Sequence, residues 1–501
     1  MSEHDNSKKL DEAAKTELEK LEAKGLSTLT MKDRLAIPSQ CMPELDACYR
    51  ARSMEEVACG YSEAQAVLEA QRCLHCKKPF CMDGCPVHIS IPEFIAYIAK
   101  GDFDGAIAKI KETSLLPAIC GRVCPQERQC QKSCTVGKSL KDVNKSVAIG
   151  RLERFCADYE RNKGKVKIPS VKPATGKRVA VIGSGPAGLA VAADVRREGH
   201  AVTIFEAFHK LGGVMRYGIP EFRLPKAIVD KEIETLAAMD VEFKTNFVIG
   251  RTEKLMDLLD KEGYDAVFIG TGAGLPLFMN IEGENLVGVF AANEYLTRAN
   301  LMRAYDSDHA DTPIWKGKNV AVLGGGNVAM DASRMALRLG AEKVRIFYRR
   351  SMAELPARKE EIAHAQAEGV EFCVLENPSK ILGNDKGRVR GMIVDRFELG
   401  EPDAKGRPRP VKLEGQSFEV ECDTVLVAIG NGSNPLISKS TPDLKVNVKG
   451  NIELSDPETQ KTFIEKIYAG GDIVLGAATV ILAMGEGRKA AAGINKYLAG
   501  K

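Results

Sequence analysis

Eight of the 14 cysteines in this 501-residue chain lie within 62 residues, and their spacing constrains the fold more than any other feature. Thiolates two to five residues apart, with proline beside a closing cysteine, are typical of loops that wrap [4Fe–4S] clusters. The last cysteine of such a run often binds a different cluster, so two interleaved clusters are expected. The pattern reads Cys73-x2-Cys76-x4-Cys81-x3-Cys85-Pro86 and, after a spacer, Cys120-x3-Cys124-Pro125-x5-Cys130-x3-Cys134.

Two other roles for these thiols fit the sequence less well. A disulfide framework needs an oxidising compartment, and the polar, charged residues 1–20 do not form a signal peptide. Zinc knuckles also use Cys-x2-Cys, but zinc favours separated cysteine pairs over a run of four closed by Cys-Pro. We therefore expect iron–sulfur clusters in a reducing, cytoplasmic protein.

The overall composition excludes several classes of protein. A net charge of +3 is too weak to indicate nucleic acid or a membrane surface as a partner. Aromatic residues make up 6% of the chain, which argues against base-stacking platforms. No apolar run approaches the ~20 residues that cross a bilayer. The length is sufficient for two to four domains with cores of their own.

Helical patterns surround the cysteines. Ser62–Arg72 pairs a serine N-cap with a run of strong helix formers and leads directly into Cys73. Residues 91–110 and 147–159 have helical periodicity as well. We expect a small helical domain that depends on its metal for stability, followed by a Lys/Pro/Gly linker at Lys163–Pro173.

A first glycine motif follows this linker. The predicted strand Arg178–Ile182 runs into Gly183–Gly188, which has the pattern Gly-x-Gly-x-x-Gly, and then into an Ala-rich helix. A second strand, Ala201–Phe205, ends in Glu206. The glycines allow a tight turn, close approach to a pyrophosphate and close helix packing, while the acid can accept from ribose hydroxyls. These residues predict a dinucleotide site for an adenosine with a free ribose, such as FAD.

A second unit of the same kind begins at the predicted strand Asn319–Leu323. Its turn, Gly324–Ala329, has alanine at the third glycine position. Its second strand, Val344–Tyr348, ends in Arg349 and Arg350 instead of an acid. Guanidinium groups bind a 2′-phosphate, so this unit favours NADP over NAD.

Three further strand-to-glycine segments complete the pattern. Asp265–Gly274 and Thr424–Asn431 each end a predicted strand in a glycine-containing loop, one after each glycine-motif unit. Ile467–Asp472 ends in Gly-Gly-Asp before the start of a helix near Thr479. An Asp there can accept from a ribityl hydroxyl, and the helix N-terminus can direct N–H groups at a flavin.

The motifs together resemble one family of proteins. The chain is similar to the small (β) subunit of NADPH-dependent glutamate synthase. It is also similar to the large subunit of the NADH-dependent reduced ferredoxin:NADP oxidoreductase, which is electron-bifurcating, and to the N-terminal half of dihydropyrimidine dehydrogenase. The residues that carry the resemblance are Arg72–Cys76, Cys120–Gln126, Gly150–Phe155, Gly213–Pro220, Gly324–Asp331 and Ala469–Asp472.

The resemblance implies two [4Fe–4S] clusters with crossed ligation. One cluster would have four cysteine ligands: Cys73, Cys76, Cys81 and Cys134. The other would have three, Cys85, Cys124 and Cys130, and Glu153 matches the place where relatives supply a Gln or Glu as the fourth ligand. A solvent-facing carboxylate is the alternative role for Glu153. Cys120 is a non-ligand in the relatives.

The resemblance also implies the residues that bind the nucleotides, with no catalytic side chain. The FAD residues would be Gly183, Gly185, Pro186, Ala187, Gly188, Glu206, Gly213, Arg216, Thr271, Gly272, Gly471, Asp472, Ala478 and Thr479. The NADPH residues would be Gly324, Gly326, Asn327, Val328, Arg349 and Arg350.

The implied fold is α/β with an N-terminal helical iron–sulfur domain and two Rossmann-like domains, the NADP domain inserted in the FAD domain. The expected division is a helical extension (1–30), a two-cluster domain (31–165), a first FAD-binding segment (171–296), the NADPH-binding domain (297–427) and a second FAD-binding segment (428–501).

The implied activity is hydride transfer from NADPH to FAD, followed by single-electron transfer through the clusters. A partner large subunit would then make glutamate from 2-oxoglutarate and glutamine-derived ammonia. The alternative is bifurcation with a second flavoprotein subunit and ferredoxin. A non-catalytic electron-relay scaffold is a third hypothesis, against which the intact Gly324 turn and the arginine pair argue.

Overall fold

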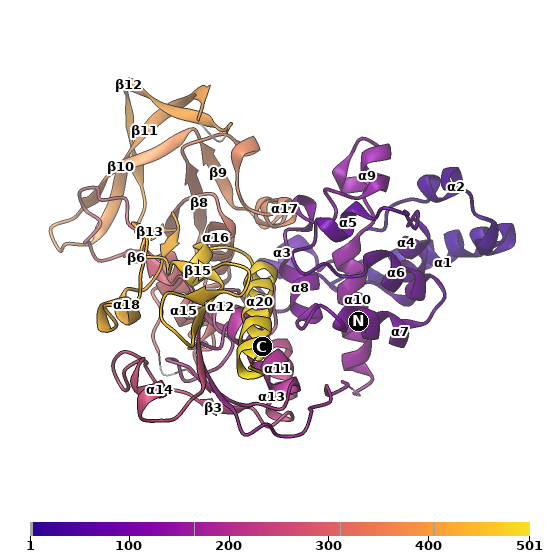
Figure 1. Cartoon of the computed structure of the whole chain (residues 1–501). Helices are drawn as coiled ribbons and strands as arrows, with labels where there is room; N and C mark the ends of the chain where they lie inside the picture. Colours follow the sequence, from indigo (N-terminus) through magenta and orange to yellow (C-terminus); the bar gives the residue numbers. More distant parts are fainter. Residues whose placement is uncertain (1–3, 165, 311, 404–405, 501) are drawn as a thin grey trace.

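The structure, a computed structural model, describes residues 4–164, 166–310, 312–403 and 406–500. A helical N-terminal region packs beside two regions built on mainly parallel sheets (Figure 1). The strands of the second sheet lie between the two chain segments that build the first sheet. The predicted fold class is therefore confirmed. None of the described helices is both long and apolar enough to cross a membrane.

The N-terminal region is built from short helices and loops. Helix α4 begins in a capping box, in which Ser62 and Gln65 each bond the other's backbone N–H, and it ends beside Cys73. Most of its apolar residues belong to one core with the neighbouring helices. The helices are α1 (Ser7–Lys24), α2 (Met31–Ala36), α3 (Ala47–Arg50), α4 (Glu63–Gln71), α5 (Phe80–Asp83), α6 (Ile91–Ala99), α7 (Phe103–Lys111), α8 (Pro117–Val123), α9 (Thr135–Ser139), α10 (Ile149–Asn162) and the 3-10 turns η1 (Leu26–Thr28), η2 (Gln126–Arg128) and η3 (Val143–Lys145).

The first sheet has seven strands in the order β15-β16-β17-β4-β1-β2-β3. Its central strands are parallel, so their carboxyl ends meet at one edge. The strands are β1 (Arg178–Ile182), β2 (Ala201–Phe205), β3 (Glu242–Lys244), β4 (Ala266–Ile269), β15 (Leu454–Asp456), β16 (Lys461–Thr462) and β17 (Ile467–Ala469). The helices of this region are α11 (Pro186–Arg197), α12 (Val214–Tyr217), α13 (Lys226–Ala237), α14 (Asp257–Asp260), α18 (Leu436–Ser440), α19 (Asp472–Leu475) and α20 (Val480–Leu498).

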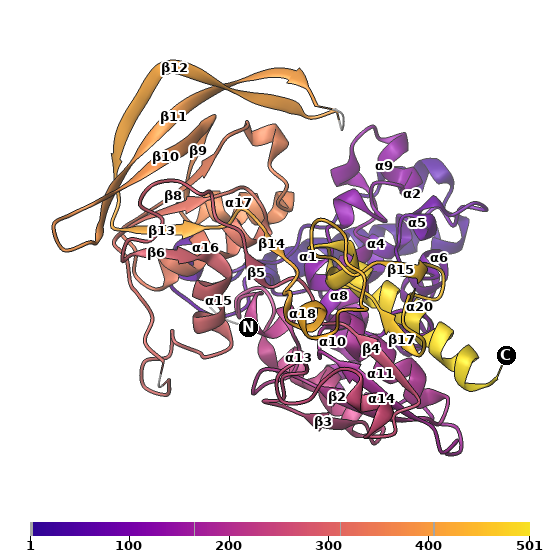
Figure 2. The same cartoon turned by 60° about the vertical axis from the view of Figure 1, so that its left-hand side comes forward.

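The second sheet has five parallel strands in the order β6-β13-β7-β8-β9. It comprises β6 (Val289–Ala291), β7 (Asn319–Leu323), β8 (Lys343–Tyr348), β9 (Glu371–Val374) and β13 (Thr424–Val427), with α15 (Ala292–Asn300), α16 (Asn327–Arg338), η4 (Met352–Glu354) and α17 (Lys359–Ala367). An antiparallel sheet, β10 (Glu376–Gly383), β11 (Val389–Pro402) and β12 (Pro408–Glu421), extends from it (Figure 2). Strands β5 (Leu275–Pro276) and β14 (Asn431–Gly432) pair where the chain passes between the two regions.

The chain enters the second sheet earlier than the expected boundary. That boundary, between residues 296 and 297, falls inside α15. Strand β6 precedes it and already pairs with β13. Because β6 is short and only partly buried, its hydrophobic pattern does not distinguish it from a loop.

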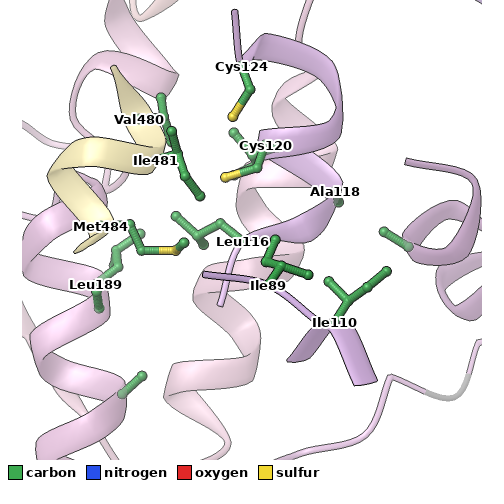
Figure 3. Close-up of a cluster of buried hydrophobic side chains, with 14 of the residues drawn as sticks. Ile89, Ile110, Leu116, Ala118, Cys120, Cys124, Leu189, Val480, Ile481 and Met484 are labelled. Atoms are coloured by element: carbon green, nitrogen blue, oxygen red, sulfur yellow. The ribbon is translucent and has the colours of Figure 1, made fainter. Parts of the chain in front are cut away.

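The N-terminal region and the first sheet share one apolar core. Residues of α8 face α11 and α20 across their junction. Figure 3 shows Val480, Ile481 and Met484 of α20 directed toward Cys120, Cys124 and Leu116. A Cβ on Gly485 would lie 3.4 Å from the carbonyl oxygen of Pro86. The chain just after Cys85 and the chain around Cys124 therefore both lie against α20.

Candidate iron–sulfur and nucleotide sites

The structure brings the first predicted cysteine set together. Cys73, Cys76, Cys81 and Cys134 line one small pocket together with Pro79 and Phe80. They come from the end of α4, the following loop, α5 and the N-cap of α9. The Cys76 thiol donates to Thr135 Oγ1 at 3.3 Å. Burial, and next the charge of Cys134, raises the pKa of Cys81 to about 12.

The second predicted set also converges. Burial raises the pKa of Cys85 to about 11, and Glu153 and Cys124 are close enough to add to the rise. Burial likewise raises the pKa of Cys130, again with Cys85, Cys124 and Glu153 as neighbours. Four potential ligands from three chain segments therefore surround one buried site. Cys120 lies against Cys124 in the same group.

Glu153 is the most informative member of this set. It lies on α10 with only 6% of its surface exposed, so it is not a solvent-facing carboxylate. Burial raises its pKa to about 8, and the Ser114 hydroxyl, 3.4 Å from its Oε1, opposes the rise. A buried carboxylate among three thiols suits coordination to a cationic iron atom, because an isolated charge would be costly there.

The spacing of the thiols fits a cluster better than a single zinc ion. Four sulfurs around one tetrahedral zinc ion lie about 3.8 Å apart, given Zn–S bonds of about 2.3 Å. Among the described residues, three ligand atoms lie within 4.8 Å of one another only at Glu44, Glu360 and His364. Neither cysteine set brings three ligand atoms that close together, which agrees better with a centre larger than one zinc ion.

The first glycine turn has the geometry expected of a pyrophosphate loop. Gly183 has a φ of 98°, and a Cβ on it would lie 2.6 Å from Gly270 O. A Cβ on Gly188 would lie 2.0 Å from Gly183 O, so helix and strand pack as closely as predicted. Gly185 faces open space. The next two residues, Pro186 and Ala187, begin α11 and are buried.

Glu206 holds this turn in place. Its Oε2 accepts from the N–H and hydroxyl of Ser184 at 3.0 and 2.5 Å. Its Oε1 accepts from the N–H of Phe208 at 2.9 Å. Ser184 Oγ in turn accepts from Gly212 N–H at 2.9 Å. The carboxylate therefore orders the loop around the predicted ribose position as well as lying at the end of β2.

Other predicted FAD residues lie at the same sheet edge. Gly213, with a φ of 54°, approaches Gly185 so closely that a Cβ on it would lie 2.7 Å from Gly185 Cα. Thr271 and Gly272 follow β4, which pairs with β1. Arg216 is directed away from open solvent. Its Nε donates a hydrogen bond to the carbonyl of Leu211 at 3.1 Å, and its guanidinium forms an ion pair with Asp230.

The Gly-Gly-Asp segment follows β17 at this edge. Gly471 has a φ of 78° and precedes Asp472, the first residue of α19. Burial raises the pKa of Asp472 to about 6, and the N–H of Ala478, 3.3 Å from its Oδ1, opposes the rise. Thr479 caps α20 by accepting from Leu482 N–H at 3.3 Å.

Sequence reasoning missed Tyr217 at this edge. Burial raises its pKa to about 12, with Asp472 and Glu206 close enough to contribute. Its ring also contacts Phe208 edge-on at 5.7 Å between centroids. Tyr217 lies within the Gly213–Pro220 segment quoted above, but nothing in its spacing distinguishes it from a core tyrosine.

The second glycine turn repeats the geometry of the first. Gly324 has a φ of 130°, and a Cβ on it would lie 2.3 Å from Ala428 O. Gly326 faces open space. Asn327 begins α16 and its Oδ1 accepts from Arg358 N–H at 2.9 Å. Val328, the next residue, packs against the core of this region.

The two arginines after β8 differ. Arg349 is exposed at the strand end, where a 2′-phosphate would lie. Arg350 is 8% exposed, and its Nε donates to Pro408 O in the β12 hairpin at 2.9 Å. It also lies 4.0 Å from the carboxylate of Asp403. The structure therefore gives Arg350 a partner of its own and leaves Arg349 facing solvent.

The segment Leu355–Arg358 joins the second turn to the cysteine loops. Ala357 N–H donates to Gly325 O at 3.1 Å. Arg128, two residues before Cys130, donates to the carbonyls of Leu355, Pro356 and Ala357 at 3.2, 2.8 and 3.2 Å. Leu355–Arg358 is called the bridging segment below. These are long-range contacts without a local sequence signal.

Comparison with known proteins agrees with this arrangement. Residues 50–165 match the family described as dihydropyrimidine dehydrogenase domain II, 4Fe–4S cluster. Residues 177–487 match the pyridine nucleotide-disulphide oxidoreductase family. Mycobacterium tuberculosis FprA in complex with NADPH superposes with a TM-score of 0.54 over 66% of this chain and 85% of that chain, at 20% identity. That likeness supports the fold.

Curated relatives match over much more of the chain. The glutamate synthase [NADPH] small chain of Halomonas elongata is 38% identical over 90% of this chain and 94% of the relative. That of Escherichia coli K12 is 39% identical over 87% and 92%. The beta subunit of the NADP(+)-dependent formate dehydrogenase of Moorella thermoacetica is 39% identical over 84% of this chain but 60% of its own length.

The fold and the converging sites define the class of protein, an NADPH-dependent oxidoreductase with a 4Fe–4S domain and FAD- and NADPH-binding regions. Within that class, the chain belongs to the family of NADPH-dependent glutamate synthase small chains. The similarity to this family inferred from its motifs is thereby confirmed.

Proposed function

We propose that this chain takes electrons from NADPH through FAD and two [4Fe–4S] clusters to a partner large subunit, which makes glutamate from 2-oxoglutarate and glutamine-derived ammonia. The convergence of Cys85, Cys124, Cys130 and Glu153 beside the complete four-cysteine set supports two clusters most directly. The synthase small chains match over more than nine tenths of their own length, which favours their activity over that of the formate dehydrogenase subunit.

The cofactors supply the electron chemistry when bound: FAD accepts hydride and releases single electrons, and the clusters carry those electrons one at a time. The chain binds and orients them. The N–H groups at the start of α11 and α16 face the space left open at Gly185 and Gly326, where each pyrophosphate would lie. Glu206 would accept from the FAD ribose, and Arg349 would bind the NADPH 2′-phosphate.

We expect the two cysteine sets to lie at different distances from the predicted FAD site. The Cys124 set lies against α20, whose N-terminus follows Asp472 and Thr479 at the FAD edge. The Cys73 set opens to a pocket beyond it. Glu153 and the three thiols would hold the cluster nearer the flavin, and Cys73, Cys76, Cys81 and Cys134 the cluster nearer the partner.

The compartment belongs to the same proposal. None of the 14 cysteines, all of which lie among the described residues, is in a disulfide, which suits a reducing cytoplasm. The curated relatives are called small chains, which supports a permanent large-subunit partner.

The experiment is an anaerobic NADPH titration of the purified chain, with iron, sulfide and flavin counts. We expect about eight irons and one FAD per chain, and flavin bleaching by NADPH in preference to NADH. Glu153→Ala should leave about four irons, and the glutamate synthase large chain of Escherichia coli should form glutamate when mixed with the wild type. Four irons in the wild type would exclude the second cluster, and unbleached flavin would favour an electron-relay scaffold.

A further inference from the structure

The two cysteine sets differ in their access to solvent. Three thiols of the first set, Cys73, Cys76 and Cys81, are half-buried and Cys134 is buried, whereas in the second set Cys85 alone is half-buried and Cys124 and Cys130 are buried. Helices α5 and α9, which contribute to the first set, lie side by side in both views, far from α11 at the base of the FAD-binding region (Figures 1 and 2). The first set is therefore the end of the helical domain that a second protein can approach.

The surface over the first set carries exposed lysines. Lys77 and Lys78 directly follow Cys76, and Lys138 lies on α9, four residues after Cys134. None of the three has an ion-pair partner among the described residues. Lys138 Nζ lies instead 5.0 Å from the centroid of the Phe80 ring. We call this group, Lys77, Lys78, Lys138 and Phe80, the lysine face.

Further positive charge lies just behind this face. Arg34 donates to the carbonyls of Gln71 and Cys73 at 2.6 and 3.4 Å. An acid, Asp83, also lies on α5, 4.0 Å from His88. Lys77, Lys78, Lys138 and Arg34 together place four positive charges near the first set, although the chain as a whole carries only +3.

Phe80 gives the face an apolar centre. It is 50% exposed while its neighbour Cys81 belongs to the first cysteine set. Pro79 lines the same pocket. An exposed aromatic residue surrounded by lysines has the composition of an interface core with a charged rim.

We propose that the lysine face docks the acidic face of a redox protein that holds its own one-electron centre. The inference rests on the proposed function, since it names the chemistry of the electron-accepting partner. Exposed lysines without ion-pair partners attract acidic groups over about 10 Å at ordinary salt and so speed correct encounter. Phe80 then excludes water at the point closest to Cys81, Cys76 and Cys73.

The probe is an acidic [2Fe–2S] ferredoxin, with basic cytochrome c as the opposite-charge comparison. Binding to the full cluster-loaded chain is measured anaerobically without NADPH, at low and high sodium chloride. We expect ferredoxin to bind at low salt and to dissociate at high salt, and cytochrome c not to bind. Because no NADPH is present, this result is independent of hydride transfer.

Charge-reversal variants test the residues themselves. Lys77→Glu/Lys78→Glu should weaken ferredoxin binding about 10- to 100-fold at low salt and flatten its salt dependence. Lys439→Glu/Lys449→Glu, equal in charge change but placed at and beyond α18, away from α9 in Figure 1, should bind as the wild type does. Phe80→Ala should weaken binding at high and low salt alike.

The controls separate this proposal from the proposed function. Flavin bleaching by NADPH and the iron content should be unchanged in the two double variants, and binding by Phe80→Ala is compared per loaded cluster, because Phe80 lines the pocket of the first set. Equal weakening by the two double variants would show a net-charge effect and overturn the docking site. Wild-type binding by the Lys77/Lys78 variant, or binding of the wild type to anionic phospholipid vesicles but not to ferredoxin, would also overturn it. Failure of NADPH to bleach the flavin while ferredoxin still binds would overturn only the proposed function.

Discussion

Gly324 and Gly326 lie in the same turn, yet the structure gives them different constraints. A Cβ on Gly324 would collide with Ala428 O at 2.3 Å in a backbone conformation that L-residues rarely adopt. A Cβ on Gly326 would meet no atom of the chain within 4 Å and would instead occupy the predicted pyrophosphate space. One substitution therefore tests folding and the other tests binding.

We expect Gly326→Ala to keep the thermal stability of the wild type and to raise the Kd for NADPH about 10-fold or more, because it displaces the phosphate from the α16 N-terminus. Gly324→Ala should lower the melting temperature by several degrees. Isothermal titration and thermal denaturation measure the two effects. A destabilised Gly326→Ala chain with normal affinity would contradict the assignment of the open side of the turn.

The arginine pair after β8 gives a second residue-level prediction. Arg349→Ala should raise the KM for NADPH about 10- to 100-fold and leave the KM for NADH unchanged, since one charge-assisted contact to the 2′-phosphate is lost. Arg350→Ala should lower stability, because its Nε bonds Pro408 O in the hairpin. The comparison uses NADPH- and NADH-driven flavin bleaching. Equal loss with both nucleotides would exclude Arg349 as the residue that selects NADPH.

The residues that sequence could assign are those whose role depends on local spacing. The glycine turns, Glu206 and Arg349 follow from strand–turn–helix patterns, and the fold class is confirmed. The roles of Arg350, Tyr217 and Arg128 depend on chain segments brought together by folding, so no local pattern encodes them. The assignment of individual ligands, and the division into domains, stay predictions.

The bridging segment is the element that connects the two kinds of site. It contacts the second glycine turn through Ala357 and Arg358, and the Cys130 loop through Arg128. A short loop that bonds both sides holds the NADPH turn at a fixed place relative to the second cysteine set. Helix η2 therefore positions the nucleotide turn as well as a metal loop.

We expect Arg128→Ala to weaken NADPH binding about 5- to 30-fold, because three hydrogen bonds to the bridging segment are lost. Arg128→Lys should recover some of the affinity. The electron paramagnetic resonance signal of the reduced clusters should also differ between NADP+-bound and free wild type, and this difference should shrink in Arg128→Ala. A signal insensitive to NADP+ in the wild type would show that the bridging segment does not couple the NADPH site to the clusters.

At the scale of the whole molecule, the helical domain and the FAD-binding region are not independent units. Val480, Ile481 and Met484 of α20 pack into the same core as Leu116, the N-cap of α8, and Cys120 within α8. A small helical domain that surrounds metal sites, here predicted to be two, depends on its metal for order. If the second cysteine set becomes disordered, helix α20 should therefore lose order too. The N-terminus of α20 lies at the FAD edge.

We expect loss of the second cluster to loosen the flavin more than loss of the first. Cys124→Ala removes a ligand from the set that faces α20, and should lower the temperature of flavin release by about 5 °C or more. Cys76→Ala removes a ligand from the distal set and should change that temperature little. Flavin fluorescence on heating measures release, and iron counts confirm which cluster is lost. Equal shifts in the two variants would show that the distance of each set from α20 has no bearing on how firmly the flavin is held.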